Sequence, residues 1–211
     1  MSFCGSLTYL ADNSPWGVEM DLLFSRSSIF DVLEHQTSAL KQEAEHLDSA
    51  TLEEVPEQEV VRDLASKYKL EVPALQEDKA YISHREIDID VSHDPMRLIF
   101  NRSEPFYIRG VEITFSVPFR GDPDLFHIRP SSFNLNPPRG EINGNEIHII
   151  TQRTDNNAAA AKTQYEETLG NIKQYLGWLR VSVEEFNSKI GQQVESLVRL
   201  TCSPKFSPAK T

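Results

Sequence analysis

The longest pattern in the chain is a stripe of apolar residues that recurs at alternating spacings of four and three. Its members are Tyr165, Leu169, Ile172, Leu176, Leu179, Val183, Phe186, Ile190, Val194, Leu197 and Leu200. This spacing keeps the stripe on one side of an α-helix about 54 Å long. A helix of that length cannot cover its own stripe, so the rest of the chain or a second protein must cover it.

The start of this helix is marked by Asp155-Asn156-Asn157, which are good capping residues, and its continuity has two interpretations. Ser182 and Glu185 have the spacing of a capping box, which would break the segment into a helical hairpin near Arg180. The apolar rhythm passes through Val183 without a change of phase, and this favours one continuous helix.

The N-terminal third predicts two further helices. Ser27 or Ser28 can cap the first, and Pro56 is well placed to begin the second because proline has no amide hydrogen to leave unpaired. Pro73 is expected to stop the second helix. Two adjacent helices suggest a helix-turn-helix, but the second carries acids and bases in balance and therefore has no grip on phosphate.

From Tyr81 onward the apolar period changes from helical spacing to two. This alternation is typical of antiparallel strands with one wet face. Residues 87–91 and 111–117 form two such strands, 125–129 a third, and Asn143-Gly144 predicts a hairpin into a strand containing residues 147–150. No helical segment separates the strands, which argues against a parallel, doubly wound sheet.

Together these elements predict an α+β fold in one integrated domain. Residues 1–79 form an acidic, mainly helical part that includes a short strand at 18–24. Residues 80–153 form a mainly antiparallel sheet of four or five strands. Residues 154–203 form a long helix or helical hairpin, and 204–211 form a tail.

Charge is divided unevenly along the chain. Residues 1–94 carry 20 acids and 7 bases, whereas residues 95–211 carry 12 acids and 14 bases. The acidic part would repel phosphate backbones, which argues against broad nucleic-acid binding. The acidic face is either simply solvated or a dock for a basic partner.

The two cysteines, Cys4 and Cys202, have neither metal-ligand spacing nor a disulfide framework, which indicates a reducing compartment. Residues 1–10 lack the basic and apolar regions of a secretory signal, and no apolar run reaches the roughly 18 residues of a membrane span. We therefore expect a cytoplasmic protein that does not enter membranes.

The strongest candidate metal ligands are His84, Glu86, Asp88 and Asp90, which alternate along one strand. Neighbours on one strand face lie about 7 Å apart, so another segment would have to complete a site; His93 and Asp94 are the nearest candidates. The alternative is a charged edge strand whose acids oppose aggregation.

A second cluster lies in residues 97–153, where all seven basic residues are arginine. Arginine binds carboxylates and phosphates with a planar fork. The tight turn at 118–124 places Arg120 near His127 and Arg129, which predicts a pocket for a small anionic ligand such as a nucleotide or phosphorylated metabolite. Alternatively, Arg120 pairs with an acid of its own turn and Arg129 with an acid of the sheet.

No arrangement in the sequence supports nucleophilic catalysis. The chain contains neither a glycine elbow around a serine nor a phosphate-binding glycine loop, so we expect no cofactor and lean against an enzyme. Gly170, Gly177 and Gly191 follow members of the apolar stripe. They indicate either close approach of a neighbouring element or simple tolerance within a well-packed helix.

The leading functional hypothesis is a non-catalytic interaction or regulatory module, a subunit or adaptor of a larger assembly. Its expected partner interface, or coiled-coil self-association surface, is the distal stripe of Phe186, Ile190, Val194 and Leu197. The alternatives are a sensor of an anionic small molecule that uses Arg120, His127 and Arg129, and a metal-dependent hydrolase built on the His84–Asp90 face.

Overall fold

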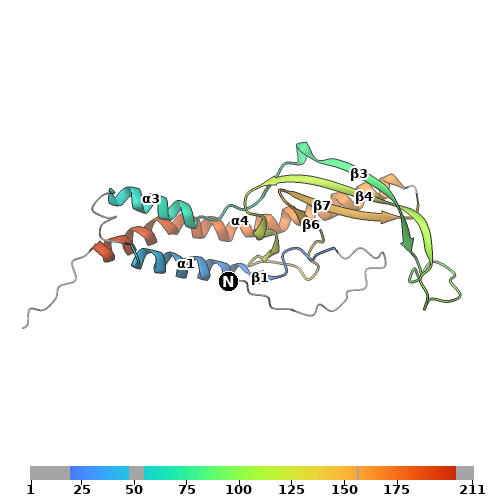
Figure 1. The fold of residues 1–211 in the computed structure, drawn as a ribbon, viewed down its shortest axis with the longest axis horizontal. Helices are drawn as coiled ribbons and strands as arrows, with labels where there is room; N and C mark the ends of the chain where they lie inside the picture. The colour runs from blue at the N-terminus through green and yellow to red at the C-terminus, as the bar shows by residue number, and fades with distance from the viewer. Residues whose placement is uncertain (1–19, 48–54, 156, 203–211) are drawn as a thin grey trace, which may run out of the picture.

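The computed structural model describes residues 20–47, 55–155 and 157–202, and it has the predicted α+β architecture. Helix α4 (Ala158–Cys202) runs the length of the molecule, and the other elements are arranged along it (Figure 1). The sheet covers its first half, while α1 (Ile29–Glu45) and α3 (Glu57–Tyr68) flank its second half.

The long helix is continuous, as the unbroken apolar rhythm predicts. Its 45 residues span about 67 Å. Asn157 caps it by accepting a hydrogen bond from the Ala160 amide at 3.0 Å. Ser182 does not start a new helix; its hydroxyl lies 3.1 Å from that of Ser131 in a neighbouring loop.

The N-terminal helices begin where their capping residues stand. Ser28 and Asp31 form a capping box at the start of α1, and Pro56 directly precedes α3. The strand predicted over residues 18–24 is reduced to a single bridge between Leu22 and Arg139 within the described residues, and its first two positions lie outside them. Leu23 and Phe24 are both buried, which a strand with one wet face does not allow.

The main sheet has five strands and its ladders are antiparallel. The central strand β4 (Tyr107–Arg120) pairs with both β2 (Ala74–Leu75) and β3 (Tyr81–Asp90). It also pairs with β7 (Glu146–Arg153), and β7 in turn pairs with β6 (Glu141–Asn143). The predicted hairpin joins β6 to β7, and Gly144 takes the positive φ of +58° that this turn requires.

The third strand predicted at 125–129 is wrong. Residues Pro123–His127 form the 3₁₀ helix η2, and only Ile128–Arg129 (β5) is extended, paired in parallel with β1 (Ser27–Ser28). Asp122 caps η2 by accepting from the Asp124 amide at 2.9 Å, and proline at the first helical position favours this geometry. Leu125 and Phe126 are therefore neighbours that are both buried.

Helix α4 shares two apolar cores. In the first, it packs against the sheet, and Tyr165 stacks on Phe115 with ring centroids 4.3 Å apart. In the second, its distal turns pack against α1 and α3. Leu33 of α1 contacts both cores and so links them. Among the described residues, no helix is both long and apolar enough to cross a bilayer.

Candidate functional site

The distal stripe proposed as a partner interface is covered by the chain's own helices. Phe186, Ile190 and Val194 are buried in the second core, and Leu197 is half-buried beside them. Because α1 and α3 occupy the space next to them, Phe186, Ile190 and Val194 stabilise the bundle and do not form an open face, whereas Leu197 also lines a groove of about 450 Å³ between α1 and α4.

The three residues of the predicted anion pocket are held by different parts of the fold. Arg120 is the last residue of β4 and lies opposite Ala74 of β2. His127 is the last residue of η2, and its carbonyl oxygen accepts a hydrogen bond from the Arg26 amide at 2.9 Å. The Arg129 guanidinium lies over the Phe133 ring, 5.1 Å from its centroid. No hydrogen bond or ion pair joins any two of the three within the described residues, and the strand expected to align His127 with Arg129 is a 3₁₀ helix.

The acidic residues of β3 likewise do not form a metal centre. Glu86 pairs with Arg109 at 2.8 Å, and the Asp90 carboxylate accepts from the amides of Ser92 at 2.9 Å and Phe106 at 3.0 Å. In the part of the chain that the structure describes, no group of three or more His, Cys, Asp or Glu residues is arranged to hold a metal ion. The wide spacing along one strand is the physical reason.

The clearest surface feature is the connection between β3 and β4, residues 91–106, which we call the tip loop. It lies at the end of the molecule opposite the bundle of α1 and α3 (Figure 1). Three large apolar side chains of the tip loop are almost completely exposed: Met96 at 91%, Leu98 at 102% and Phe100 at 109%. Three large apolar side chains exposed within five residues are unusual on a protein surface unless they contact something.

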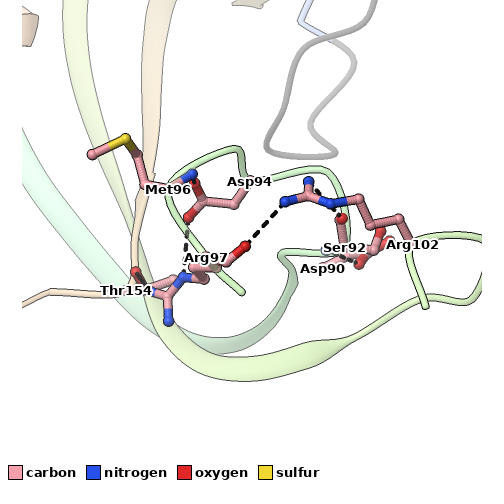
Figure 2. A network of polar contacts seen from close by, with 7 residues as sticks. All are labelled: Asp90, Ser92, Asp94, Met96, Arg97, Arg102 and Thr154. Carbon is pink, nitrogen blue, oxygen red and sulfur yellow. Dashed lines mark hydrogen bonds and ion pairs between the residues drawn. The ribbon is translucent and has the colours of Figure 1, made fainter. Parts of the chain in front are cut away.

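A polar network gives the tip loop its shape (Figure 2). Asp94 accepts from the Met96 amide at 2.9 Å and from the Arg97 guanidinium at 3.0 Å, and Arg97 also donates to Thr154 at 2.9 Å. Arg102 donates to the carbonyl oxygens of Arg97 at 3.0 Å and Ser92 at 3.4 Å. Arg102 therefore binds the loop's own backbone, and Arg97 ties Asp94 of the loop to Thr154, just after the end of β7.

The base of the tip loop is buried and anchored to the sheet. Val91 and Ser92 are 0% and 2% exposed, and the Val91 amide donates to the Phe106 carbonyl at 2.8 Å. Hydrogen bonds from Ser92 and from the Phe106 amide hold the pKa of the Asp90 carboxyl below its ordinary value. The base of the tip loop is thus fixed to the sheet, while three of its large apolar side chains remain exposed.

Sequence reasoning missed this surface. The run from Met96 to Phe100 is mostly apolar and lies between Pro95 and Pro105, and a short buried strand would look the same in sequence. The proline on each side was the available signal for a loop. Only the structure establishes that no described residue covers the three side chains.

Comparison of this chain with known proteins identifies no relative. No family model, no curated protein and no solved structure matches this chain.

Proposed function

We propose that this protein is a non-catalytic interaction module, a subunit or adaptor, that docks onto a partner protein through its tip loop. The observation that carries the proposal is the exposure of Met96, Leu98 and Phe100 on a loop whose backbone is fixed by its own polar network. A fixed backbone lowers the entropic cost of binding, because little ordering remains to be done on contact.

The charge of the surroundings favours a protein partner over an anionic membrane. The tip loop and the adjoining end of β3 carry four acids, Asp88, Asp90, Asp94 and Glu104, against two arginines. Arg97 is paired with Asp94 and Thr154, and Arg102 is bound to backbone carbonyls of the loop. The whole chain has a net charge of −11. Anionic lipids would be repelled, whereas an apolar pocket with a basic rim would be complementary to this tip.

The test is affinity capture with the full chain and quantitative mass spectrometry. Changing Met96, Leu98 and Phe100 together to Ser should release the specific partner, because burying each side chain contributes about 1.5–3 kcal/mol. The melting temperature should stay the same, because all three are already exposed. Val181→Ser is the matched control, since Val181 is a 68% exposed apolar residue on α4.

Two outcomes would contradict the proposal. One is that the triple variant and the wild type capture the same proteins in the same amounts. The other is that the wild type, but not the triple variant, sediments with neutral phosphatidylcholine vesicles, which would assign the tip loop to lipid.

A further inference from the structure

Strand β3 presents a free edge on the sheet. Among the described strands it pairs only with β4, and residues 81–86 are all exposed. The hydrogen bond from Val91 to Phe106 continues the same register, which makes the odd-numbered residues of β3 the ones bonded to β4. The backbone N–H and C=O groups of Ile82, His84, Glu86 and Asp88 therefore point outward, away from the sheet.

An apolar groove of about 410 Å³ lies beside this edge, between β3 and the first turns of α4. Phe115 and Tyr165 stack on each other at one side, Ile82 and Ile113 line the strands, and Ala158 and Ala161 line the helix. The small alanine side chains leave space between helix and strand. Ile82 is 65% exposed in this groove, which leaves its side chain available to a ligand.

The sheet register places the charged residues of β3 on this same face. Ile82 is opposite Phe115, which stacks on Tyr165 of α4, so Ile82 lies on the face of the sheet that α4 covers. Alternate residues of a strand share a face, so His84, Glu86 and Asp88 lie on the same face, past the point where α4 begins. Ile87 and Ile89 lie on the other face, opposite Gly110 and Ile108. Two carboxylates, Glu86 and Asp88, face one guanidinium, Arg109, which leaves this part of the edge acidic.

From this arrangement we infer that the β3 edge binds an extended segment of a partner protein as an added strand. The outward backbone groups supply the hydrogen bonds, and side chains at alternate positions supply the selectivity. An apolar side chain of the segment occupies the groove beside Ile82, and basic side chains lie beside Glu86 and Asp88. This second surface is independent of the tip loop, so either proposal can fail alone.

The register specifies the sequence pattern of the bound segment. All ladders of the main sheet are antiparallel, so an added strand is expected to run antiparallel to β3. Read from its N-terminus, such a strand meets Asp88 first, then Glu86, His84 and Ile82. The pattern is therefore basic, any, basic, any, small polar, any, apolar.

The experiment uses the full chain and a synthetic, end-blocked peptide with the sequence Lys-Thr-Lys-Thr-Ser-Thr-Leu-Thr. Fluorescence anisotropy should show saturable binding, and a peptide with serine in place of leucine should bind roughly tenfold or more weakly. A peptide with glutamate in place of both lysines should also bind more weakly, by about threefold to tenfold. Amide hydrogen exchange should slow at Ile82, His84, Glu86 and Asp88 when the peptide is bound.

His84→Pro provides the matched test of the backbone contact. Proline removes an outward N–H that β4 does not use, so the strand tolerates it while the added strand loses a hydrogen bond. His84→Thr keeps the N–H and should bind like the wild type. Circular dichroism checks that both variants fold.

Three results would overturn the inference. The first is an absence of saturable binding by the peptide at millimolar concentration. The second is that the wild type has the mass of a dimer in solution and the His84→Pro variant has the mass of a monomer. The β3 edge would then be an interface between two copies of this chain. The third is slow exchange at the four outward amides of the monomer without peptide, which would mean that the chain covers its own edge.

Discussion

Two glutamates on neighbouring strands show how burial sets the importance of a single residue. Glu112 and Glu86 each pair with an arginine across the β3–β4 ladder, but their side chains are 8% and 67% exposed. The alternation of residues 111–117 predicts a solvent-facing side chain for Glu112, which stands between the apolar Val111 and Ile113. The structure instead buries Glu112, whose carboxylate accepts hydrogen bonds from the Arg85 guanidinium at 2.6 Å and from the Gln152 side-chain amide at 2.9 Å.

The balance of forces on Glu112 follows from these contacts. Burial raises the pKa of its carboxyl, but the hydrogen bonds from Arg85 and Gln152 outweigh burial, and the pKa lies below its ordinary value. The carboxylate therefore stays ionised at neutral pH inside the sheet.

We predict that Glu112→Ala lowers the free energy of unfolding by about 1–3 kcal/mol, because it leaves partners in a buried network without their acceptor. Glu86→Ala should change it by less than about 0.5 kcal/mol, as is usual for an exposed pair. Urea denaturation measures both. Equal losses in the two variants would show that burial does not distinguish them.

His127, at the end of η2, is expected to make the stability of the protein depend on pH. Burial, followed by the nearby Arg26 charge, lowers the pKa of His127. Its Nδ1 is buried without a hydrogen-bond partner in the described part of the chain. The unfolded chain, with an ordinary histidine pKa of about 6.5, therefore takes up the proton first as the pH falls.

The wild type should accordingly lose stability as the pH falls below about 6.5, and His127→Gln should lose less over the same range. Melting temperatures between pH 8 and pH 5 measure the difference. His84→Gln is the control for the substitution itself, because it makes the same change at an exposed histidine of β3. A His127→Gln profile parallel to the wild type would be inconsistent with this assignment.

At the scale of the elements, the glycines of the chain serve different purposes. A Cβ atom built on Gly170, Gly177 or Gly191 of α4 meets nothing within 4 Å, so these glycines do not serve the close approach of a neighbouring described element. At Gly110 of β4, a Cβ would lie 2.7 Å from the Arg153 carbonyl oxygen and against the Ile89 side chain. The glycine at that position makes room for Ile89.

Gly177→Ala should therefore stabilise the protein by about 0.5–1 kcal/mol, since alanine favours the helix and has open space. Gly110→Ala should destabilise it, because the backbone oxygen of Arg153 cannot move without breaking the β4–β7 ladder. Thermal and urea unfolding measure both signs. A loss of stability in Gly177→Ala would indicate a neighbour on that flank of α4.

At the scale of the whole molecule, α4 joins two cores that lie one after the other along its axis (Figure 1). Leu33 contacts both cores. Asn187 of α4 also binds both backbone groups of Leu70, which lies between α3 and the sheet, at 2.9 and 3.2 Å. These links favour cooperative unfolding of the bundle and the sheet.

We predict that Ile190→Ala, a change in the bundle core, lowers the stability of the sheet half as well. The cavity should cost about 2–5 kcal/mol. In a Trp16→Phe background, Trp178 fluorescence reports the first core, and far-UV circular dichroism reports all helices. The two signals should shift together to lower denaturant. The opposite result would be a fluorescence midpoint equal to that of the parent protein together with two separate transitions in the dichroism. It would show that the bundle and the sheet unfold independently.

The sequence by itself determined the features that depend on neighbours a few positions apart. The helical period of α4, its cap at Asn157, the capping box of α1 and the Asn143-Gly144 turn are local, so their physical causes are readable in the sequence. The η2 segment shows the limit of such patterns, because a short apolar run reads as a strand until both Leu125 and Phe126 are seen to be buried.

Only the tertiary structure decided which surfaces are covered. In the sequence, the distal stripe of α4 has the apolar residues expected of a protein interface, but in the structure α1 and α3 bury it. Met96, Leu98 and Phe100 look like part of a strand, yet no described element packs on them, and the free edge of β3 exists only because no described strand lies beside it. Coverage depends on segments that are distant along the chain, so local spacing does not contain it.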